Sequence, residues 1–272
     1  MYLKTAFRIL KNLISPETPH HRDYARLDIV RFMARLILPR YRFEWPSLDW
    51  WNDESFNAYL QQFGELQGAS SLRSRSRWMV YQLLRLAEPI PGDTAECGVF
   101  AGASSYLICR FLQSKSQACT HFIFDSFEGL SQPSVEDGLE WSKGLLSHSL
   151  EATKANLPFS NISWQKGWIP DRFAQAADRR FAFVHIDVDL YQPTRDSIEF
   201  FYSRMNEGGI LVCDDYGFSG CPGATLAVDE FLKDKPEKMV AMASGGGFLI
   251  KGRTTAGNFL GLPRHELTPA TE

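Results

Sequence analysis

Short apolar runs alternate with helical segments from about residue 72 onward, and this alternation restricts the fold more than any other feature of the chain. Such alternation is the sequence mark of parallel βαβ units. The apolar runs predict strands at 93–99, 120–125, 161–167, 181–187 and 209–215. The segments between them predict helices at 103–113, 149–157 and 195–205. We therefore expect an α/β domain built on a mostly parallel sheet.

The last part of this domain has a different pattern. After a predicted helix at 224–234, two strand-like runs at 237–244 and 247–253 are joined by glycines. A glycine-rich link between two such runs is typical of a hairpin, so we expect about seven strands with the last one antiparallel. The chain is then divided into a helical N-terminal extension at 1–70, the main domain at 71–253 and a C-terminal tail at 254–272.

Composition excludes several classes of protein. With 272 residues, 44% of them hydrophobic, the chain is long enough to bury one sizeable core. A formal net charge of −3 and a pI near 6.1 give no electrostatic case for binding nucleic acid. The five cysteines show neither a CxxC motif nor a zinc spacing, which fits a reducing cytoplasm better than a disulfide framework. No segment approaches the roughly 20 apolar residues of a membrane span.

The first 14 residues predict an amphipathic helix, because Leu3, Phe7, Leu10 and Ile14 recur at helical spacing. Basic residues interrupt the segment, so it lacks the continuous apolar core of a signal peptide. We expect this helix to pack against the domain or against a second subunit in a homo-oligomer. A weak membrane-surface helix is the alternative that the pattern leaves open.

Five acidic residues lie at or near the ends of the predicted strands: Glu96, Asp125, Asp187, Asp214 and Asp215. Ligands of open α/β sheets bind outside the carboxyl ends of the strands. The fold would therefore gather these acids at one edge of the sheet. Burying an unpaired carboxylate costs several kcal/mol, so such a group needs cations or hydrogen-bond donors around it.

The segment AECGVFAGASS joins the first strand to its helix and predicts a cofactor-binding turn. Gly98 and Gly102 stand four apart, so the segment is not a GxGxxG motif. Asp125 lies 23 positions after Gly102, where an acid is suited to bind ribose hydroxyls. Glu96 inside the turn would repel a pyrophosphate but would suit an amine. These features favour S-adenosyl-L-methionine, which has a ribose and an amine but no phosphate.

The remaining acids predict a metal site made of oxygen ligands. We expect Asp187, Asp214 and Asp215 to bind Mg²⁺ or another hard divalent cation, because carboxylates suit such ions better than zinc or copper. Asp189 would orient a ligand, accept a proton or cap the next helix. His185, one step inside the strand, is expected to be a core histidine and not a ligand.

Six motifs resemble, in order and spacing, the macrocin O-methyltransferase family of S-adenosylmethionine-dependent, Mg²⁺-dependent sugar methyltransferases. They are AECGVFAGASS, FDSFEGL, GWIPDRF, HIDVDLYQPT, GGILVCDDYG and CPGATLAVDEF, and the resemblance covers roughly residues 72–250. It implies a class I methyltransferase (Rossmann-like) fold. It also implies the same metal ligands that the residue types indicate, Asp187, Asp214 and Asp215.

The resemblance further implies positions for the cofactor. Near the methionine part it places Glu96, Gly98, Gly102 and Ser104. It places Asp125 on the ribose, and Ser126, Phe127 and Trp168 near the adenine.

The expected reaction is methyl transfer to a hydroxyl of a sugar or another vicinal-hydroxyl acceptor, either a small molecule or a glycan. Asp187 would take part through the metal, and a nearby carboxylate such as Asp189 would give general-base help, although the sequence does not show which residue is the base. The long segment 130–149 contains Gly and Pro and predicts a lid in which Trp141 excludes water.

Two other functions stay open at this point. One is a non-catalytic cofactor-binding protein of a polysaccharide assembly complex, which would have no need for paired acids beside a cofactor. The other is a nicotinamide-dependent oxidoreductase, which Glu96 and the glycine spacing disfavour.

Overall fold

The computed structural model describes residues 53–65, 71–115 and 118–257, together with isolated positions nearer the N-terminus. Two compact units divide the chain, Met1–Ala58 and Tyr59–Glu272, and the sheet and all candidate site residues belong to the second. The predicted N-terminal amphipathic helix lies largely outside the described residues, as does most of the predicted C-terminal tail.

The described elements follow the expected alternation of strand and helix. The helices are α3 (Glu54–Gln62), α4 (Ser71–Leu86), α5 (Ala103–Ser114), α6 (Leu150–Asn156), α7 (Tyr191–Tyr202) and α8 (Pro222–Leu232), with 3-10 turns η3 (Val135–Asp137) and η4 (Phe173–Ala176). The strands are β1 (Asp93–Cys97), β2 (His121–Asp125), β3 (Ile162–Lys166), β4 (Phe181–Ile186), β5 (Met205–Cys213), β6 (Val240–Ala241) and β7 (Gly247–Ile250).

These strands form one sheet in the order β3-β2-β1-β4-β5-β7-β6. The first five strands pair in parallel, whereas β7 is antiparallel to both β5 and β6. The predicted seven-stranded, mostly parallel sheet with a closing antiparallel hairpin is therefore confirmed.

The helix predicted at 195–205 was placed too late in the chain, because the observed helix, α7, spans Tyr191–Tyr202. Helix α7 begins at Tyr191, because Pro193 is tolerated in the first turn, where its missing N–H needs no partner. At the other end Met205 already belongs to β5 and pairs with Phe181 of β4. The apolar residues of this segment continue from the helix into the strand, so their spacing did not mark the boundary.

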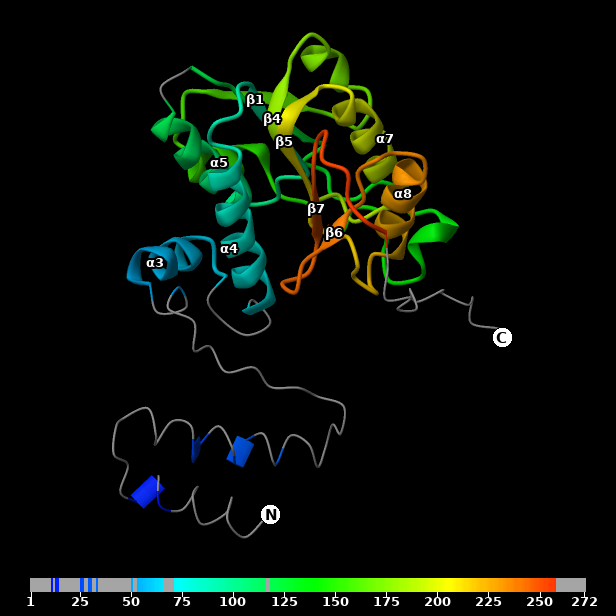
Figure 1. Cartoon of the computed structure of the whole chain (residues 1–272). Helices are drawn as coiled ribbons and strands as arrows, with labels where there is room; N and C mark the ends of the chain where they lie inside the picture. Colours follow the sequence, from blue (N-terminus) through cyan, green and yellow to red (C-terminus); the bar gives the residue numbers. More distant parts are fainter. Residues whose placement is uncertain are drawn as a thin grey trace. The chain divides into compact units, whose positions relative to one another are not determined.

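Helices α4 and α5 cover one face of the sheet, and α7 and α8 cover the other (Figure 1). Successive strand residues point to opposite faces. Phe183 of β4 accordingly packs in the cluster with α4 and α5, while its neighbour Val184 packs in the cluster with α7 and α8. His185 therefore shares a face with Phe183, under α4 and α5.

The turn after β1 passes directly over the backbone of Asp187. Gly98 has φ 78°, in the left-handed region, and a Cβ atom added there would collide with the Asp187 carbonyl oxygen. Its N–H donates to the Phe124 carbonyl at 2.9 Å, which fixes the turn against β2. Glycine is required here for the close approach as well as for the backbone conformation.

Replacing Gly98 with alanine is expected to lower the free energy of unfolding by about 1–2 kcal/mol for the left-handed backbone and by about 1–3 kcal/mol more for the collision. Gly217→Ala is the matched control, because Gly217 has φ 81° but nothing within 4 Å of an added Cβ. Urea unfolding measures both variants. Equal losses in the two would contradict the close approach at Gly98.

Candidate active site

A cavity of about 720 Å³ lies at the carboxyl ends of the parallel strands. Its lining includes eight of the residues predicted from sequence, namely Gly98, Asp125, Ser126, Trp168, Asp187, Asp189, Asp214 and Asp215. Four other predicted residues do not line it, namely Glu96, Gly102, Ser104 and Phe127. Gly102 instead begins α5 with φ 94° and packs against the side chain of Leu157.

Asp125, the last residue of β2, is held by the backbone on both sides. Its Oδ2 accepts from the Val99 N–H at 2.8 Å, and its Oδ1 accepts from the Phe127 N–H at 2.6 Å. Burial raises its pKa, against the lowering effect of these hydrogen bonds. Each carboxylate oxygen can accept a second hydrogen bond. Asp125 is thus a fixed acceptor at the edge of the cavity.

Asp187 is the least satisfied acid of the site. It follows β4, and among the residues that the structure describes no hydrogen bond reaches its carboxylate. Burial, and then the charges of Asp214 and Asp215, raise its pKa well above the usual value. A carboxylate in these surroundings ionises favourably only beside a cation.

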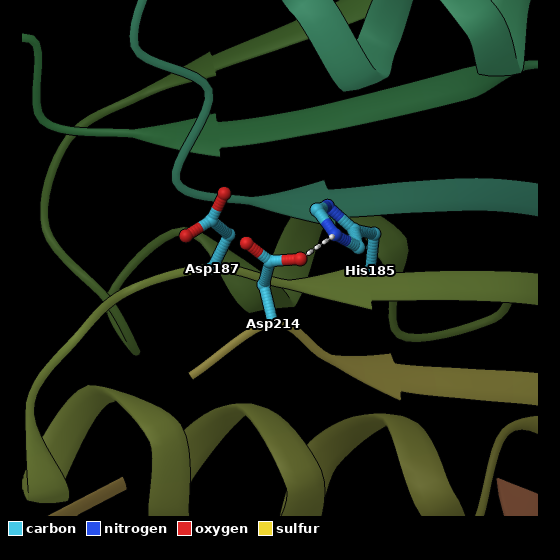
Figure 2. A group of neighbouring side chains, drawn as sticks. All are labelled: His185, Asp187 and Asp214. Atoms are coloured by element: carbon cyan, nitrogen blue, oxygen red, sulfur yellow. Dashed lines mark ion pairs between the residues drawn. The ribbon is translucent and has the colours of Figure 1, made fainter. Parts of the chain in front are cut away.

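Asp214 lies beside Asp187, and its two oxygens have different surroundings (Figure 2). Oδ1 accepts from the Ser76 hydroxyl at 2.5 Å and lies 3.6 Å from Nε2 of His185. Oδ2 lies on the side of Asp187. Burial alone would raise the pKa of Asp214, but His185 and the positive charge of Arg77 lower it below the usual range. The surroundings of Asp214 therefore favour its ionised form.

These features fit a hard divalent cation. Asp187 has a carboxylate without donors, and Asp214 turns one oxygen toward it, so the two supply the oxygen ligands that Mg²⁺ or Mn²⁺ prefers. Ligand atoms of Asp187, Asp214 and His185 all lie within 4.8 Å of one another.

Asp215, also predicted as a metal ligand, lies in a neighbouring group. Its Oδ2 accepts from the backbone N–H of Val188 at 3.2 Å and of Asp189 at 2.8 Å. Together with Asp189 and Cys221 it forms a second group of ligand atoms within 4.8 Å. Asp215 thereby stabilises the turn in which Asp189 adopts φ 59°, a left-handed conformation. Its role as a metal ligand stays a prediction.

Asp189 lines the cavity and does not cap the helix that follows it. The N-cap of α7 is Leu190, and the N–H of Tyr191 is bound instead by Oδ1 of Asp137 at 2.6 Å. The helix-capping alternative for Asp189 was therefore wrong. Burial, and then the charges of Asp187 and Asp214, raise the pKa of Asp189 to about 7.

A buried polar layer lies beneath the cavity, between the sheet and α5. Glu96 of β1 pairs through Oε1 with Nδ1 of His185 at 2.8 Å and accepts from the Ser105 hydroxyl through Oε2. Burial would lower the pKa of His185, but Asp214 and Glu96 raise it to about 10. Burial lowers the pKa of the neighbouring His121 to about 4. The surroundings therefore favour the protonated form of His185 and the neutral form of His121.

Sequence reasoning missed the contribution of α4. Arg73, Ser76 and Arg77 stand at i, i+3 and i+4 on this helix and line the cavity. The buried Arg77 pairs with Glu65 at 3.3 Å and donates to the Ser104 hydroxyl at 2.5 Å. The spacing of these residues within SLRSRSRW was the available signal.

Hydrogen bonds fix the loop at 130–149 where its two ends meet and again at Trp141. The N–H of Leu130 donates to the Leu145 carbonyl at 2.8 Å, and Trp141 Nε1 donates to the Gly220 carbonyl at 2.6 Å. Leu130 and Gly220 both line the cavity. These contacts place the loop beside the cavity, and its closure over a substrate stays a prediction.

Replacing Arg77 with methionine is expected to reduce the free energy of unfolding by about 3–5 kcal/mol, because Glu65 would remain buried without its partner. Adding Glu65→Met should restore part of that loss. Arg85→Met is the control, since Arg85 is exposed on the same helix and, within the described residues, its side chain bonds only Gln82. Its effect should stay within about 0.5 kcal/mol. Chemical denaturation of the wild type and these three variants measures the differences. A double variant no more stable than Arg77→Met would contradict the role of the pair.

No helix in the described ranges is both long and apolar enough to cross a membrane.

Two curated relatives match about half of the chain. A Streptomyces olivaceus enzyme, 8-demethyl-8-(2,3-dimethoxy-alpha-L-rhamnosyl)-tetracenomycin-C 4'-O-methyltransferase, is 30% identical over 152 residues, covering 51% of this chain and 58% of the relative. Demethyldecarbamoylnovobiocin O-methyltransferase of Streptomyces niveus is 30% identical over 157 residues, covering 52% and 58%. The matched part therefore spans less than two thirds of either relative.

Solved structures share the fold. The O-methyltransferase NovP superposes with a TM-score of 0.57 at 23% identity, covering 66% of this chain and 81% of that one. A calicheamicin methyltransferase superposes with a TM-score of 0.56 at 16% identity, covering 92% and 93%. The predicted class I methyltransferase fold is thereby confirmed. The model of the macrocin O-methyltransferase (TylF) family matches residues 81–240, more than half of the chain, and the protein belongs to that family.

Proposed function

We propose that this protein is an S-adenosyl-L-methionine-dependent and divalent-metal-dependent O-methyltransferase that acts on a hydroxyl of a sugar or another vicinal-hydroxyl acceptor. One observation carries the proposal. A single cavity holds a fixed ribose-type acceptor, Asp125, and the donor-free carboxylate of Asp187 beside the ionised Asp214. Membership of the macrocin O-methyltransferase family supports the same reading.

The cofactor half of the cavity is formed by the ends of β1, β2 and β3. Gly98, Asp125, Ser126 and Trp168 line it, as expected for residues around the methionine, ribose and adenine of S-adenosylmethionine. That cofactor supplies an electrophilic methyl group when bound. The task of these residues is to hold the donor in line with the acceptor, since position accounts for much of the rate of such a displacement.

The metal half is formed by the ends of β4 and β5. Asp187 and Asp214 would hold Mg²⁺ or another hard divalent cation, with Asp215 from the neighbouring group as the third predicted ligand. When bound, such an ion lowers the pKa of a hydroxyl that it contacts and helps to orient it. The Ser76 hydroxyl fixes the Asp214 carboxylate, and a lowered pKa favours its charged form, as a ligand of a cation requires.

Asp189 is the residue that we assign to proton removal from the acceptor. It lines the cavity two positions after Asp187, and the backbone bonds to Asp215 hold its turn in place. A positioned general base typically contributes about 100- to 10,000-fold to a rate.

The relatives guide the choice of acceptor. One is named for a rhamnosyl sugar of a tetracenomycin and another for a novobiocin precursor, both of which are natural products. A cavity of about 720 Å³ has room for a cofactor and part of a small acceptor, within the usual range for such sites. We therefore assign the acceptor to a hydroxylated sugar on a metabolite or glycan, bound at the side where the 130–149 loop lies.

Replacing Asp187 or Asp214 with asparagine is expected to reduce Mg²⁺-dependent methyl transfer by more than the about 10–100-fold that loss of an outer-shell partner typically costs. Transfer of a radiolabelled methyl group to a panel of glycosides and nucleotide sugars, with and without Mg²⁺, measures it. Asp178→Asn, at an exposed position outside the cavity, is the matched control. Full activity in either site variant would contradict the metal assignment. A wild-type protein that binds cofactor but methylates none of the panel would favour the non-catalytic alternative.

Replacing Asp125 with asparagine is expected to weaken S-adenosylhomocysteine binding by roughly 10- to 100-fold, because hydrogen bonds to a charged acceptor contribute about 1.5–3 kcal/mol. Titration calorimetry measures the affinity, and the exposed neighbour Glu128→Gln is the control. Wild-type protein should not bind NADH. Binding of NADH without binding of S-adenosylhomocysteine would favour the oxidoreductase alternative instead.

A further inference from the structure

Glu96 was expected beside the amine of the cofactor, but its side chain contacts His185 and Ser105 instead. Glu96 lies on β1 in register with His185 of β4, and it is almost fully buried without lining the cavity. Oε1 pairs with Nδ1 of His185 at 2.8 Å, and Oε2 accepts from the Ser105 hydroxyl. Glu96 therefore fixes the ring of His185 from below the cavity.

The other ring nitrogen of His185 points at the acid cluster. His185 is fully buried, and its Nε2 is one of two side-chain atoms in the described part of the chain that are buried without a hydrogen-bond partner. That atom faces Oδ1 of Asp214 at 3.6 Å, within ion-pair reach but too far for a hydrogen bond (Figure 2). A buried polar atom left without a partner is costly, so its position beside Asp214 calls for an explanation.

Asp214 is the neighbouring group that this arrangement serves. Oδ1 is occupied by the Ser76 hydroxyl at 2.5 Å and faced by His185, which leaves Oδ2 on the side of Asp187 (Figure 2). Ser76 comes from α4 and His185 from the sheet, so the carboxylate is held from two sides. The orientation of the Asp214 carboxylate is therefore set by Ser76 and His185 and not by Asp187.

We infer that His185, held by Glu96, is a positioning residue that orients the Asp214 carboxylate toward a divalent cation. This inference rests on the proposed function and adds an outer shell to its metal site. Outer-shell partners of this kind typically change metal affinity by about 10–100-fold. His185 acts through Asp214, because its ring is buried and does not line the cavity.

His121 provides a matched control within the same buried layer. It is as fully buried as His185, and it bonds Thr94 Oγ1 and Ser105 Oγ, both at 2.9 Å. Both of its ring nitrogens therefore have partners, and neither faces an acid of the cavity. Replacing it with glutamine removes a buried imidazole of equal size without touching Asp214.

The test is the affinity for Mn²⁺, measured by electron paramagnetic resonance of the free ion, in wild type, His185→Gln, Glu96→Gln, the double variant and His121→Gln. His185→Gln should weaken Mn²⁺ binding about 10- to 100-fold while S-adenosylhomocysteine affinity stays unchanged. The double variant should lose no more than His185→Gln, because both residues act on the same carboxylate. His121→Gln should change the unfolding midpoint only.

Three results would overturn the inference. A folded His185→Gln protein with wild-type Mn²⁺ affinity removes the positioning role and leaves the metal site intact. A directly bound imidazole nitrogen, detected by pulsed resonance of the wild-type Mn²⁺ complex, would make His185 a ligand instead. Wild-type protein that binds no Mn²⁺ would overturn the proposed metal site together with this inference.

A measurement on wild-type protein covers the case in which the His185 and Glu96 variants do not fold. Nitrogen-15 resonances of the His185 ring should shift when Mg²⁺ is added, while those of His121 should not. Unchanged His185 resonances at a saturating Mg²⁺ concentration would overturn the inference without any substitution.

Discussion

The mutual repulsion of buried carboxylates is the constraint on which the rest of the site depends. Parallel strands deliver Asp187, Asp214 and Asp215 to one edge of the sheet, where burial penalises their charge. Arg77 and His185 supply positive charge behind Asp214 and keep that carboxylate ionised. His185 and Arg77 also lower the pKa of Asp187, but burial and the charges of Asp214 and Asp215 outweigh them, and no described hydrogen-bond donor reaches its carboxylate. This deficit is the reason that we propose a cation site beside Asp187.

Asp214 and Asp215 are adjacent in the chain, but their side chains turn to different sides and make different contacts. Asp214 follows the alternation of β5 to the α4 side and meets Ser76 and His185 there. Asp215, one residue further, turns to the backbone of Val188 and Asp189. Two adjacent aspartates thus differ in function because a period of two residues persists just beyond the strand. The first is prepared for an ion, and the second shapes the turn that presents Asp189.

Much of the fold and the acid cluster could be predicted because both follow from local patterns. Apolar runs marked the strands, and the place where each run ends marked Asp125, Asp187 and Asp214. The spacing of Arg73, Ser76 and Arg77 on α4 could not by itself show which acid they meet. Ser76 contacts Asp214 from 138 positions away, and only the folded sheet brings the two together. From the sequence we expected Glu96 in the cofactor-binding turn. The sequence shows that Glu96 precedes Gly98, but it does not show which face of the sheet the side chain occupies.

Anomalous diffraction from crystals grown with Mn²⁺ and S-adenosylhomocysteine tests the central claim most directly. The account predicts a manganese peak bound by carboxylate oxygens of Asp187 and Asp214, in the same cavity as a cofactor whose ribose contacts Asp125. A cofactor bound without any manganese peak at these residues would contradict it. So would a peak held by Asp189 and Cys221 with the Asp187 carboxylate left free.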